Sequence, residues 1–259
     1  MIKTKIEWCD SSWNPVSGCL HDCPYCYARG TANRFKGCNL SPNGVSDEVI
    51  VELDEKLEVT NKDGITRTAA YPYGFTPTLH KYRLQDPLKK GLGKTIFVCS
   101  TADLFGEWVP DEWIVQVFDV CKQALNHRYL FLTKNPARYY ELAEKGLLPT
   151  GDSFWYGSTS TSPDMPVFWS ANHNTFVSIE PILAPFGQSE DGYNDIISKV
   201  DWFIFGAETG KRKDKVVPEK EWIADAVAEI KKAGKPVFMK DSMIPIWGDE
   251  IYTEFPWEE

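Results

Sequence analysis

The sequence predicts an α/β fold in the form of a partial or distorted (β/α) TIM-like barrel with a β-hairpin and loop insertion. From residue 94 onward, short apolar, β-branched runs of the buried parallel-strand type alternate with amphipathic helical stretches. Repeated βα units imply parallel strands joined by right-handed crossovers. Polar residues also follow most of these strands, at the end where barrels of this kind place their chemistry.

Seven strands and four helices are expected from these patterns. The strands are 13–16, 95–99, 128–132, 154–157, 175–179, 202–205 and 236–239, and the helices are 27–35, 111–126, 135–146 and 218–233. Asn135 and Pro136 supply a cap and a first-turn proline for the third helix, and Gly234 stands at the end of the fourth. The link between strands 154–157 and 175–179 has only weak helical character.

Residues 38–93 are expected to form an irregular insertion within a single domain that spans residues 1–259. Inside it, 49–53 and 56–60 have the composition of a small hairpin, and a turn follows at 61–64. The turn-rich stretch after it is of a length that is usually functional or disordered. His80 in this stretch is either a substrate contact or an exposed or capping histidine.

The composition restricts the classes of partner. The chain has 28 basic and 37 acidic residues, a net charge of −9, which disfavours broad nonspecific nucleic-acid binding. It leaves open a local basic surface, such as the run 211–215. No apolar run is long enough to span a membrane, and the first residues lack the apolar segment of a secretory signal, so a cytoplasmic protein is expected. Seven cysteines in such a chain favour metal ligation over disulfides.

Three of these cysteines, Cys19, Cys23 and Cys26, fall within eight residues. A loop this tight can turn three thiolates toward one point, which suits a metal centre. A four-iron cluster held this way would have one iron without a protein ligand. The alternative is structural zinc, which usually takes four ligands from two short pairs. No second pair is present, although His21 stands between two of the loop cysteines.

The spacing Cys-x3-Cys-x2-Cys, with the aromatic Tyr25 directly before the last cysteine, resembles the cluster loop of the radical S-adenosylmethionine (SAM) superfamily. The resemblance implies that Cys19, Cys23 and Cys26 hold a [4Fe-4S] cluster whose open iron binds SAM, and that Tyr25 lies near the adenine. It implies a barrel of the radical SAM type and reductive cleavage of SAM to a 5′-deoxyadenosyl radical. A flavodoxin- or ferredoxin-like electron donor would then be a partner.

Further segments resemble the phage Gp37/Gp68 family, a domain of unknown function carried by bacteria and phages. They are 13–19, 78–80, 96–105, 132–136, 178–181 and 201–210. Two positions depart from the family pattern, because Ser158-Thr159-Ser160 stands where an acidic strand end is expected and Cys99 replaces a small polar residue. A distant likeness to spore photoproduct lyases, which repair a thymine dimer, leaves open a nucleic-acid or nucleotide substrate.

Candidate contacts for SAM are the polar residues that follow the strands. Hydrogen-bond acceptors of the protein suit the ammonium group of SAM, and a cation or hydroxyl suits its carboxylate. Carboxylates of the protein suit the hydroxyl groups of its ribose. The candidates are Ser100, Thr101 and Asp103 for the ammonium, Lys134 and Ser158 for the carboxylate, and Glu180 and Glu208 for the ribose. For each acid the alternative is a salt bridge or a helix cap. No residue is assigned a catalytic role. The competing functional class is a non-enzymatic phage or host accessory protein that binds zinc or an iron–sulfur cluster.

Overall fold

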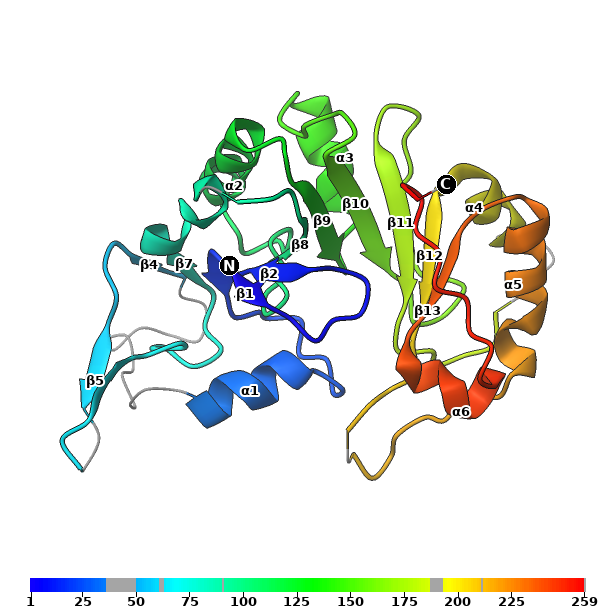
Figure 1. Cartoon of the computed structure of the whole chain (residues 1–259), viewed down its shortest axis with the longest axis horizontal. Helices are drawn as coiled ribbons and strands as arrows, with labels where there is room; N and C mark the ends of the chain where they lie inside the picture. Colours follow the sequence, from blue (N-terminus) through cyan, green and yellow to red (C-terminus); the bar gives the residue numbers. More distant parts are fainter. Residues whose placement is uncertain (36–49, 61–62, 90, 187–192, 211, 259) are drawn as a thin grey trace. The chain divides into compact units, whose positions relative to one another are not determined.

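The computed structural model describes residues 1–35, 50–60, 63–89, 91–186, 193–210 and 212–258 (Figure 1). The chain divides into two units. Unit 1 comprises Met1–Lys5 and Cys9–Tyr129, and unit 2 comprises Ile6–Trp8 and Leu130–Glu259. The first residue of the basic run 211–215, the turn residues 61–62 and much of the start of the predicted insertion lie outside the described residues.

The main sheet has eight strands in the order β1-β2-β8-β9-β10-β11-β12-β13. They are β1 (Ile2–Lys3), β2 (Ser11–Trp13), β8 (Thr95–Val98), β9 (Arg128–Thr133), β10 (Phe154–Thr159), β11 (Asn174–Ile179), β12 (Trp202–Phe205) and β13 (Val237–Met239). β1 is antiparallel to β2, and the other seven strands are parallel. The parallel strands predicted from residue 95 onward are therefore confirmed.

The prediction of a TIM-like barrel is wrong. β1 and β13 end the strand order, so the described sheet is an open α/β sheet. Among the described residues the helices are also too few for a barrel, which needs one after each strand. β10 passes to β11 through 160–173 without a helix, and helix α4 (Tyr193–Lys199) between β11 and β12 has only seven residues. Strand–helix alternation specifies parallel pairing, whereas closure depends on strand number, tilt and stagger, which alternation does not encode.

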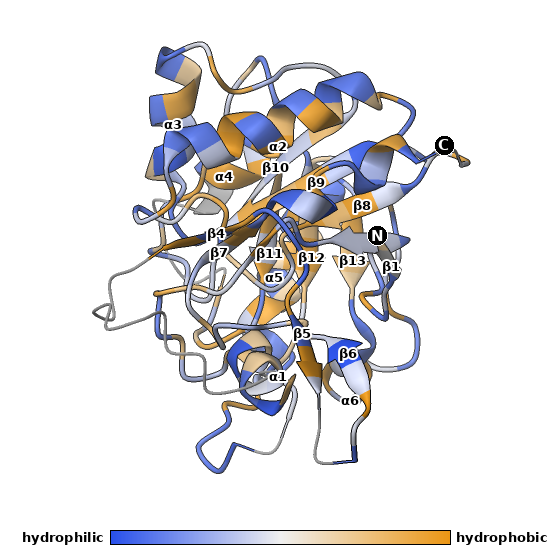
Figure 2. Ribbon diagram, turned by 90° about the vertical axis from the view of Figure 1, so that its left-hand side faces the viewer, coloured by the Kyte–Doolittle hydropathy of each residue, from blue (hydrophilic) through white to orange (hydrophobic). Residues whose placement is uncertain are grey.

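All four predicted helices are present, the first with the predicted bounds and the other three shorter than predicted. They are α1 (Tyr27–Phe35), α2 (Asp111–Gln123), α3 (Ala137–Glu144) and α5 (Glu221–Lys232), and a short α6 (Ile244–Trp247) follows. In Figure 2 the strands of the main sheet are mostly hydrophobic, whereas α2 carries hydrophilic and hydrophobic residues on different sides. α5 buries Ile223, Val227 and Ile230 at helical spacing against the strands of unit 2, with Ala226 beside them.

The predicted strand 13–16 is split in two at Asn14 and Pro15. β2 pairs in parallel with β8, whereas β3 (Val16–Ser17) pairs antiparallel with β7 (Thr78–His80) in a separate three-stranded sheet. Asn14 and Pro15 thus form the corner where the chain leaves the main sheet. This corner is what delivers the cysteine loop.

The hairpin predicted within the insertion is wrong in its pairing. β4 (Val51–Leu53) pairs in parallel with β7, and β5 (Glu58–Thr60) pairs antiparallel with β6 (Thr66–Thr68). Leu53 and all of β7 are buried, whereas β5 and β6 are largely exposed. Burial therefore draws β4 into the three-stranded sheet with β7 and leaves β5 to form a hairpin with the next strand.

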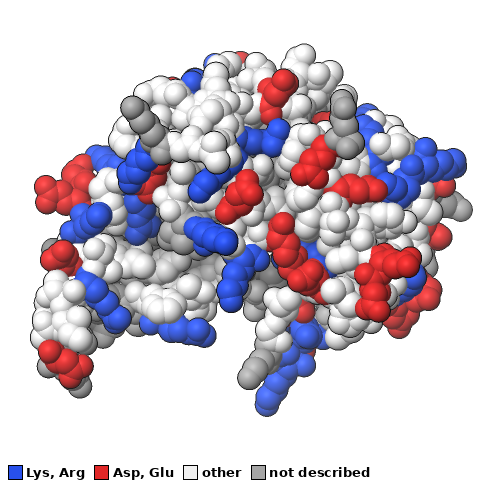
Figure 3. All heavy atoms as spheres, viewed as in Figure 1, with Lys and Arg blue, Asp and Glu red and all other residues white. Residues whose placement is uncertain are grey.

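The net charge is divided unequally between the units. Unit 1 holds 15 basic and 15 acidic residues, and unit 2 holds 13 basic and 22 acidic residues. Acidic side chains gather over α5 in Figure 3. The whole excess of −9 therefore belongs to unit 2, and the unit that carries the cysteine loop has no net charge. Among the described helices, none has the length and apolar character needed to cross a membrane.

Candidate functional site: a braced cysteine loop

The cysteine loop of unit 1 is fixed at its first residues. Gly18 N–H donates to Thr101 O at 3.0 Å, and Cys19 N–H donates to Phe75 O at 3.1 Å. Gly18 has φ +86°, and a Cβ added to it would lie 2.3 Å from Thr76 O. Only glycine fits both the left-handed backbone and this close approach. The loop therefore starts from a rigid point between two other segments of unit 1.

The turn after β8 is the second wall of the site. Cys99, which is buried, adopts φ +58°, a region that non-glycine residues rarely occupy. Its N–H donates to Trp13 O at 2.8 Å, and its carbonyl accepts from Ala102 N–H at 3.0 Å. Asn14 Oδ1 accepts from both Ser100 Oγ and Thr101 N–H, each at 3.2 Å. Strained residues of this kind persist where the surroundings over-determine them, often at functional sites.

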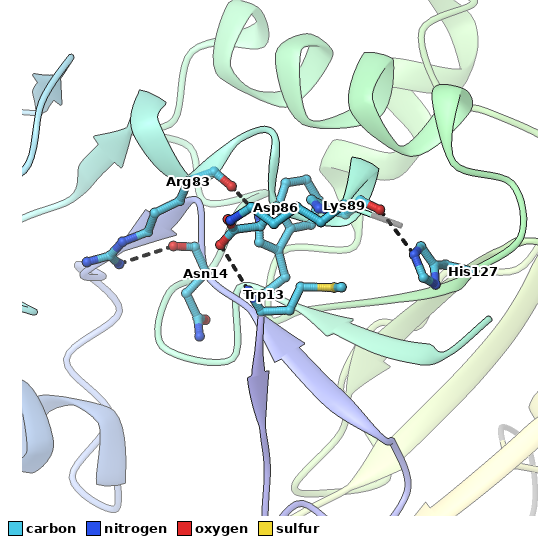
Figure 4. A network of polar contacts seen from close by, with 8 residues as sticks. Trp13, Asn14, Arg83, Asp86, Lys89 and His127 are labelled. Atoms are coloured by element: carbon cyan, nitrogen blue, oxygen red, sulfur yellow. Dashed lines mark hydrogen bonds and ion pairs between the residues drawn. The ribbon is translucent and has the colours of Figure 1, made fainter. Parts of the chain in front are cut away.

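The backbone around Asn14 is hydrogen-bonded to the segment that precedes β8 (Figure 4). Arg83 Nη1 donates to Asn14 O at 3.2 Å, and Trp13 Nε1 donates to Arg83 O at 2.8 Å. Asp86 in the same segment pairs with the N-terminal ammonium at 2.9 Å, and His127 Nε2 contacts Pro87 O at 3.1 Å. This network fixes the corner after β2, and the Asn14 side chain transmits that position to the turn after β8.

His21, between the first two loop cysteines, is clamped to the turn after β8. Its Nε2 lies 2.7 Å from Asp103 Oδ2, and Asp103 Oδ1 accepts from Phe105 N–H at 3.0 Å. The His21 ring meets the Trp108 ring edge-on with centroids 4.9 Å apart. Both oxygens of the buried Asp103 thus have partners within the chain, and the contact with His21 orients the loop. The sequence singled out Asp103 as a SAM contact, with a salt bridge or a helix cap as the alternative, and did not single out Trp108.

The three thiols are free and differ in their surroundings. Burial, reinforced by the nearby Asp103, Cys23 and Cys26, raises the pKa of Cys19 to about 12. Cys26 N–H donates to Cys23 O at 3.2 Å, and Arg29 N–H donates to Cys26 Sγ at 3.4 Å. Among the described residues, no three His, Cys, Asp or Glu side chains are arranged to hold a metal ion.

Two buried polar atoms at this site have no hydrogen-bond partner among the described residues. They are Thr101 Oγ1 in the turn after β8 and Trp108 Nε1 beside His21. An unsatisfied buried donor or acceptor costs about 1–3 kcal/mol, so such atoms commonly mark a bound ligand or water. Three residues were predicted to accept a hydrogen bond from the ammonium group of SAM. Of these, Thr101 has a hydroxyl oxygen without a partner among the described residues, whereas the Ser100 hydroxyl donates to Asn14 Oδ1.

The remaining predicted contacts lie in unit 2, apart from Tyr25, which is half-buried in the loop of unit 1. Ser158 Oγ accepts from Phe168 N–H at 2.9 Å, and Lys134 directly follows β9. Glu180 forms an ion pair with Lys240. The buried Glu208 takes a bidentate contact from Arg212 Nε and Nη2, both at 2.7 Å, which lowers the pKa of its carboxyl group. Both acids thus form salt bridges, which the sequence analysis gave as the alternative to a contact with the ribose of SAM. Their contact with the ribose stays a prediction.

His80 is fully buried, so it is not the exposed histidine considered from the sequence. Its Nε2 lies 2.8 Å from Ser17 Oγ, and its Nδ1 lies 3.2 Å from Tyr82 Oη. Burial, followed by the charge of Arg83, lowers its pKa to about 3, so the ring is neutral at pH 7. His80 therefore braces β3 directly before the cysteine loop.

Residues 3–250 match the model of a family described as "Protein of unknown function (DUF5131)". No curated protein and no solved structure matches the chain. The resemblances to the Gp37/Gp68 family, to the radical SAM superfamily and to spore photoproduct lyases stay predictions. Because the match covers nearly the whole chain, this protein belongs to the DUF5131 family of proteins of unknown function.

Proposed function

We propose that this protein is a radical SAM enzyme that binds a [4Fe-4S] cluster through Cys19, Cys23 and Cys26. The supporting observation is a loop of three free thiols beside the carboxyl ends of β2 and β8, hydrogen-bonded to the polar turn that follows β8. In parallel α/β sheets, ligands bind at the carboxyl ends of the strands. With SAM bound, such a cluster would supply one electron for reductive cleavage of SAM to methionine and a 5′-deoxyadenosyl radical, which would remove hydrogen from the substrate.

The residue types of the loop are those that bind a [4Fe-4S] cluster. Thiolates are the protein ligands of iron–sulfur clusters, and three of them leave one position for a substrate. His21 Nε2 contacts Asp103, so Nδ1 is the ring nitrogen of His21 that would serve as a fourth ligand in the zinc alternative. The thiols are not gathered in the described structure, so the three cysteines would have to come together to hold the cluster.

The other residues of the site bind and orient. Thr101 Oγ1 is the acceptor available to a ligand ammonium, and Trp108 Nε1 is a donor available to a ligand oxygen. Asp103 holds His21 and with it the loop between Cys19 and Cys23. Asn14 holds the backbone of Thr101 and so sets the direction of its side chain.

The substrate proposal remains a nucleic acid or nucleotide, and an external one-electron donor of the flavodoxin or ferredoxin kind is required. Electrostatics permits this substrate class at unit 1, because the negative excess lies in unit 2. Phosphate attraction depends on local Lys and Arg, not on the charge of the whole chain.

The test is anaerobic reconstitution with iron and sulfide, followed by an assay for 5′-deoxyadenosine with SAM and dithionite. We expect a four-iron spectrum and 5′-deoxyadenosine formation, and loss of both in Cys23→Ala. Cys9→Ala is the matched control, since Cys9 is a half-buried cysteine outside the loop. A colourless protein with one tightly bound zinc would instead establish the non-enzymatic metal-binding alternative.

A second variant separates SAM binding from cluster binding. Thr101→Val keeps the shape of the side chain and removes the unpartnered hydroxyl. We expect a normal cluster spectrum with weakened SAM binding. Unchanged SAM affinity would remove Thr101 from the site.

A further inference from the structure

Cys23 and Cys26 occupy the two ends of a single β-turn. Cys26 N–H donates to Cys23 O at 3.2 Å, which closes the turn Cys23-Pro24-Tyr25-Cys26. Proline suits the second position of such a turn, whose end Cα atoms lie less than about 7 Å apart. Disulfides need Cα atoms roughly 4.4–6.8 Å apart. A closed turn of this kind therefore brings its end residues close enough for the range that a disulfide needs.

The turn leads directly into α1. Cys26 directly precedes this nine-residue helix, and Arg29 N–H donates to its sulfur at 3.4 Å. Cys23 and Cys26 are both half-buried, so a small disulfide can reach them.

The other described cysteines are less well placed to compete. Cys19 is anchored through its N–H to Phe75 O, and Asp22, with φ +55°, turns the backbone between Cys19 and Cys23. Cys99 and Cys121 are almost completely buried. Cys9 is half-buried but stands outside the loop. Within the described part of the chain, the turn geometry therefore selects the pair Cys23 and Cys26.

We infer that Cys23 and Cys26 form a reversible disulfide when the loop holds no metal, with a small disulfide such as glutathione disulfide as the oxidant. The Cys26 thiolate attacks one sulfur of the oxidant and releases one glutathione. The Cys23 thiolate then attacks the Cys26 sulfur of the mixed disulfide and releases the second. The two cysteines lose two electrons and two protons, and the oxidant becomes two thiols.

The inference rests on the turn and on the free thiols, and it does not depend on the proposed radical SAM activity. Its consequence for the loop is competition, because a disulfide removes two of the three sulfurs that could ligate iron. Oxidation of the metal-free chain would therefore block metal uptake until a reductant restores the thiols.

The test uses the full-length, metal-free chain equilibrated in glutathione buffers of increasing oxidised fraction and then alkylated. Cleavage before Asp and after Lys or Arg releases the peptide Asp22–Arg29, whose only cysteines are Cys23 and Cys26. We expect it to lose both alkyl groups and become two hydrogens lighter as the buffer becomes oxidising. Cys19→Ala should not change this result, and Cys23→Ala should convert Cys26 to a mixed disulfide with glutathione.

Two results would overturn the inference. One is a peptide that stays doubly alkylated in every buffer, and the other is a dominant cross-link between Asp22–Arg29 and Asp10–His21, which carries Cys19. The competition is tested with ferrous iron and sulfide, and we expect no uptake by the oxidised chain and recovery after phosphine reduction. Equal uptake before and after reduction would refute it. Failure to form 5′-deoxyadenosine would count against the proposed enzyme activity alone.

Discussion

Gly18 offers a direct test of the loop geometry, through the substitution Gly18→Ala. Its backbone has φ +86°, and a new Cβ would lie 2.3 Å from Thr76 O, 2.5 Å from Thr76 C and 2.6 Å from Phe75 O. All three are backbone atoms, which cannot move aside as the end of a flexible side chain can. Gly74, with φ +63° and no atom within 4 Å of its added Cβ, is the matched control in the same unit.

The expected cost has two parts. An alanine in the left-handed region costs roughly 1–2 kcal/mol, and this part applies to both glycines. Forcing a methyl group into occupied space costs roughly a further 1–3 kcal/mol, and this part applies to Gly18 alone. Gly18→Ala should therefore lower the free energy of unfolding by about 2–5 kcal/mol, against about 1–2 kcal/mol for Gly74→Ala.

Urea unfolding of the two variants and the wild type measures this difference. The same samples should show that Gly18→Ala lowers metal uptake by the loop, because the anchor of Cys19 is displaced, while Gly74→Ala does not. If the two variants lose the same stability, the close approach of Gly18 to Thr76 does not exist in the folded protein.

Three further predictions concern residues around the loop. Between about pH 6.5 and 3 the unfolded chain protonates His80, while the folded chain keeps it neutral. As the pH is lowered through this range, the free energy of unfolding should therefore decrease by about 1.4 kcal/mol per pH unit because of this group. Urea titrations of His80→Gln should lack this contribution, and an unchanged slope would contradict the assignment. A double-mutant cycle of His21→Ala and Asp103→Asn should give a coupling energy of roughly 0.5–1.5 kcal/mol, and a value near zero would mean that the clamp does not form. Trp108→Phe should leave the free energy of unfolding within about 1 kcal/mol of wild type, since Nε1 has no partner to lose, whereas a larger loss would reveal a structural contact.

The strands of the main sheet from β8 to β13 were predictable because they are short buried runs between polar segments, whereas β1 was not predicted. The corner at Asn14 and Pro15 was missed, although an Asn-Pro pair favours a turn, and the two different pairing partners of β2 and β3 reveal the break. The barrel failed for a similar reason. Local patterns specify strands and their direction, whereas closure is a property of the whole sheet.

Part of the candidate site was likewise predictable from the sequence, and part was not. Cysteine spacing and the strand-end rule placed Ser100, Thr101 and Asp103 beside the loop, and the structure brings all three to it. The contact of His21 with Asp103 joins residues 82 positions apart, which no local pattern signals. Arg212, in contrast, stands four residues after Glu208, and that spacing could have suggested the salt bridge before any ribose contact.

The membership of Ile6–Trp8 in unit 2 makes that unit discontinuous along the chain. Trp8 is buried, and its ring packs against Phe176 at 6.1 Å and Trp202 at 6.4 Å between centroids. A fragment cut at the start of residue 130 would lack this tryptophan and expose the aromatic rings that it covers. During synthesis, moreover, Trp8 emerges long before its partners, so unit 2 completes its core only when the last strands join residues made at the very beginning. Splitting the gene at any point between Trp8 and Leu130 would therefore separate unit 2 from its own first segment, even though the cut lies within the sequence of unit 1.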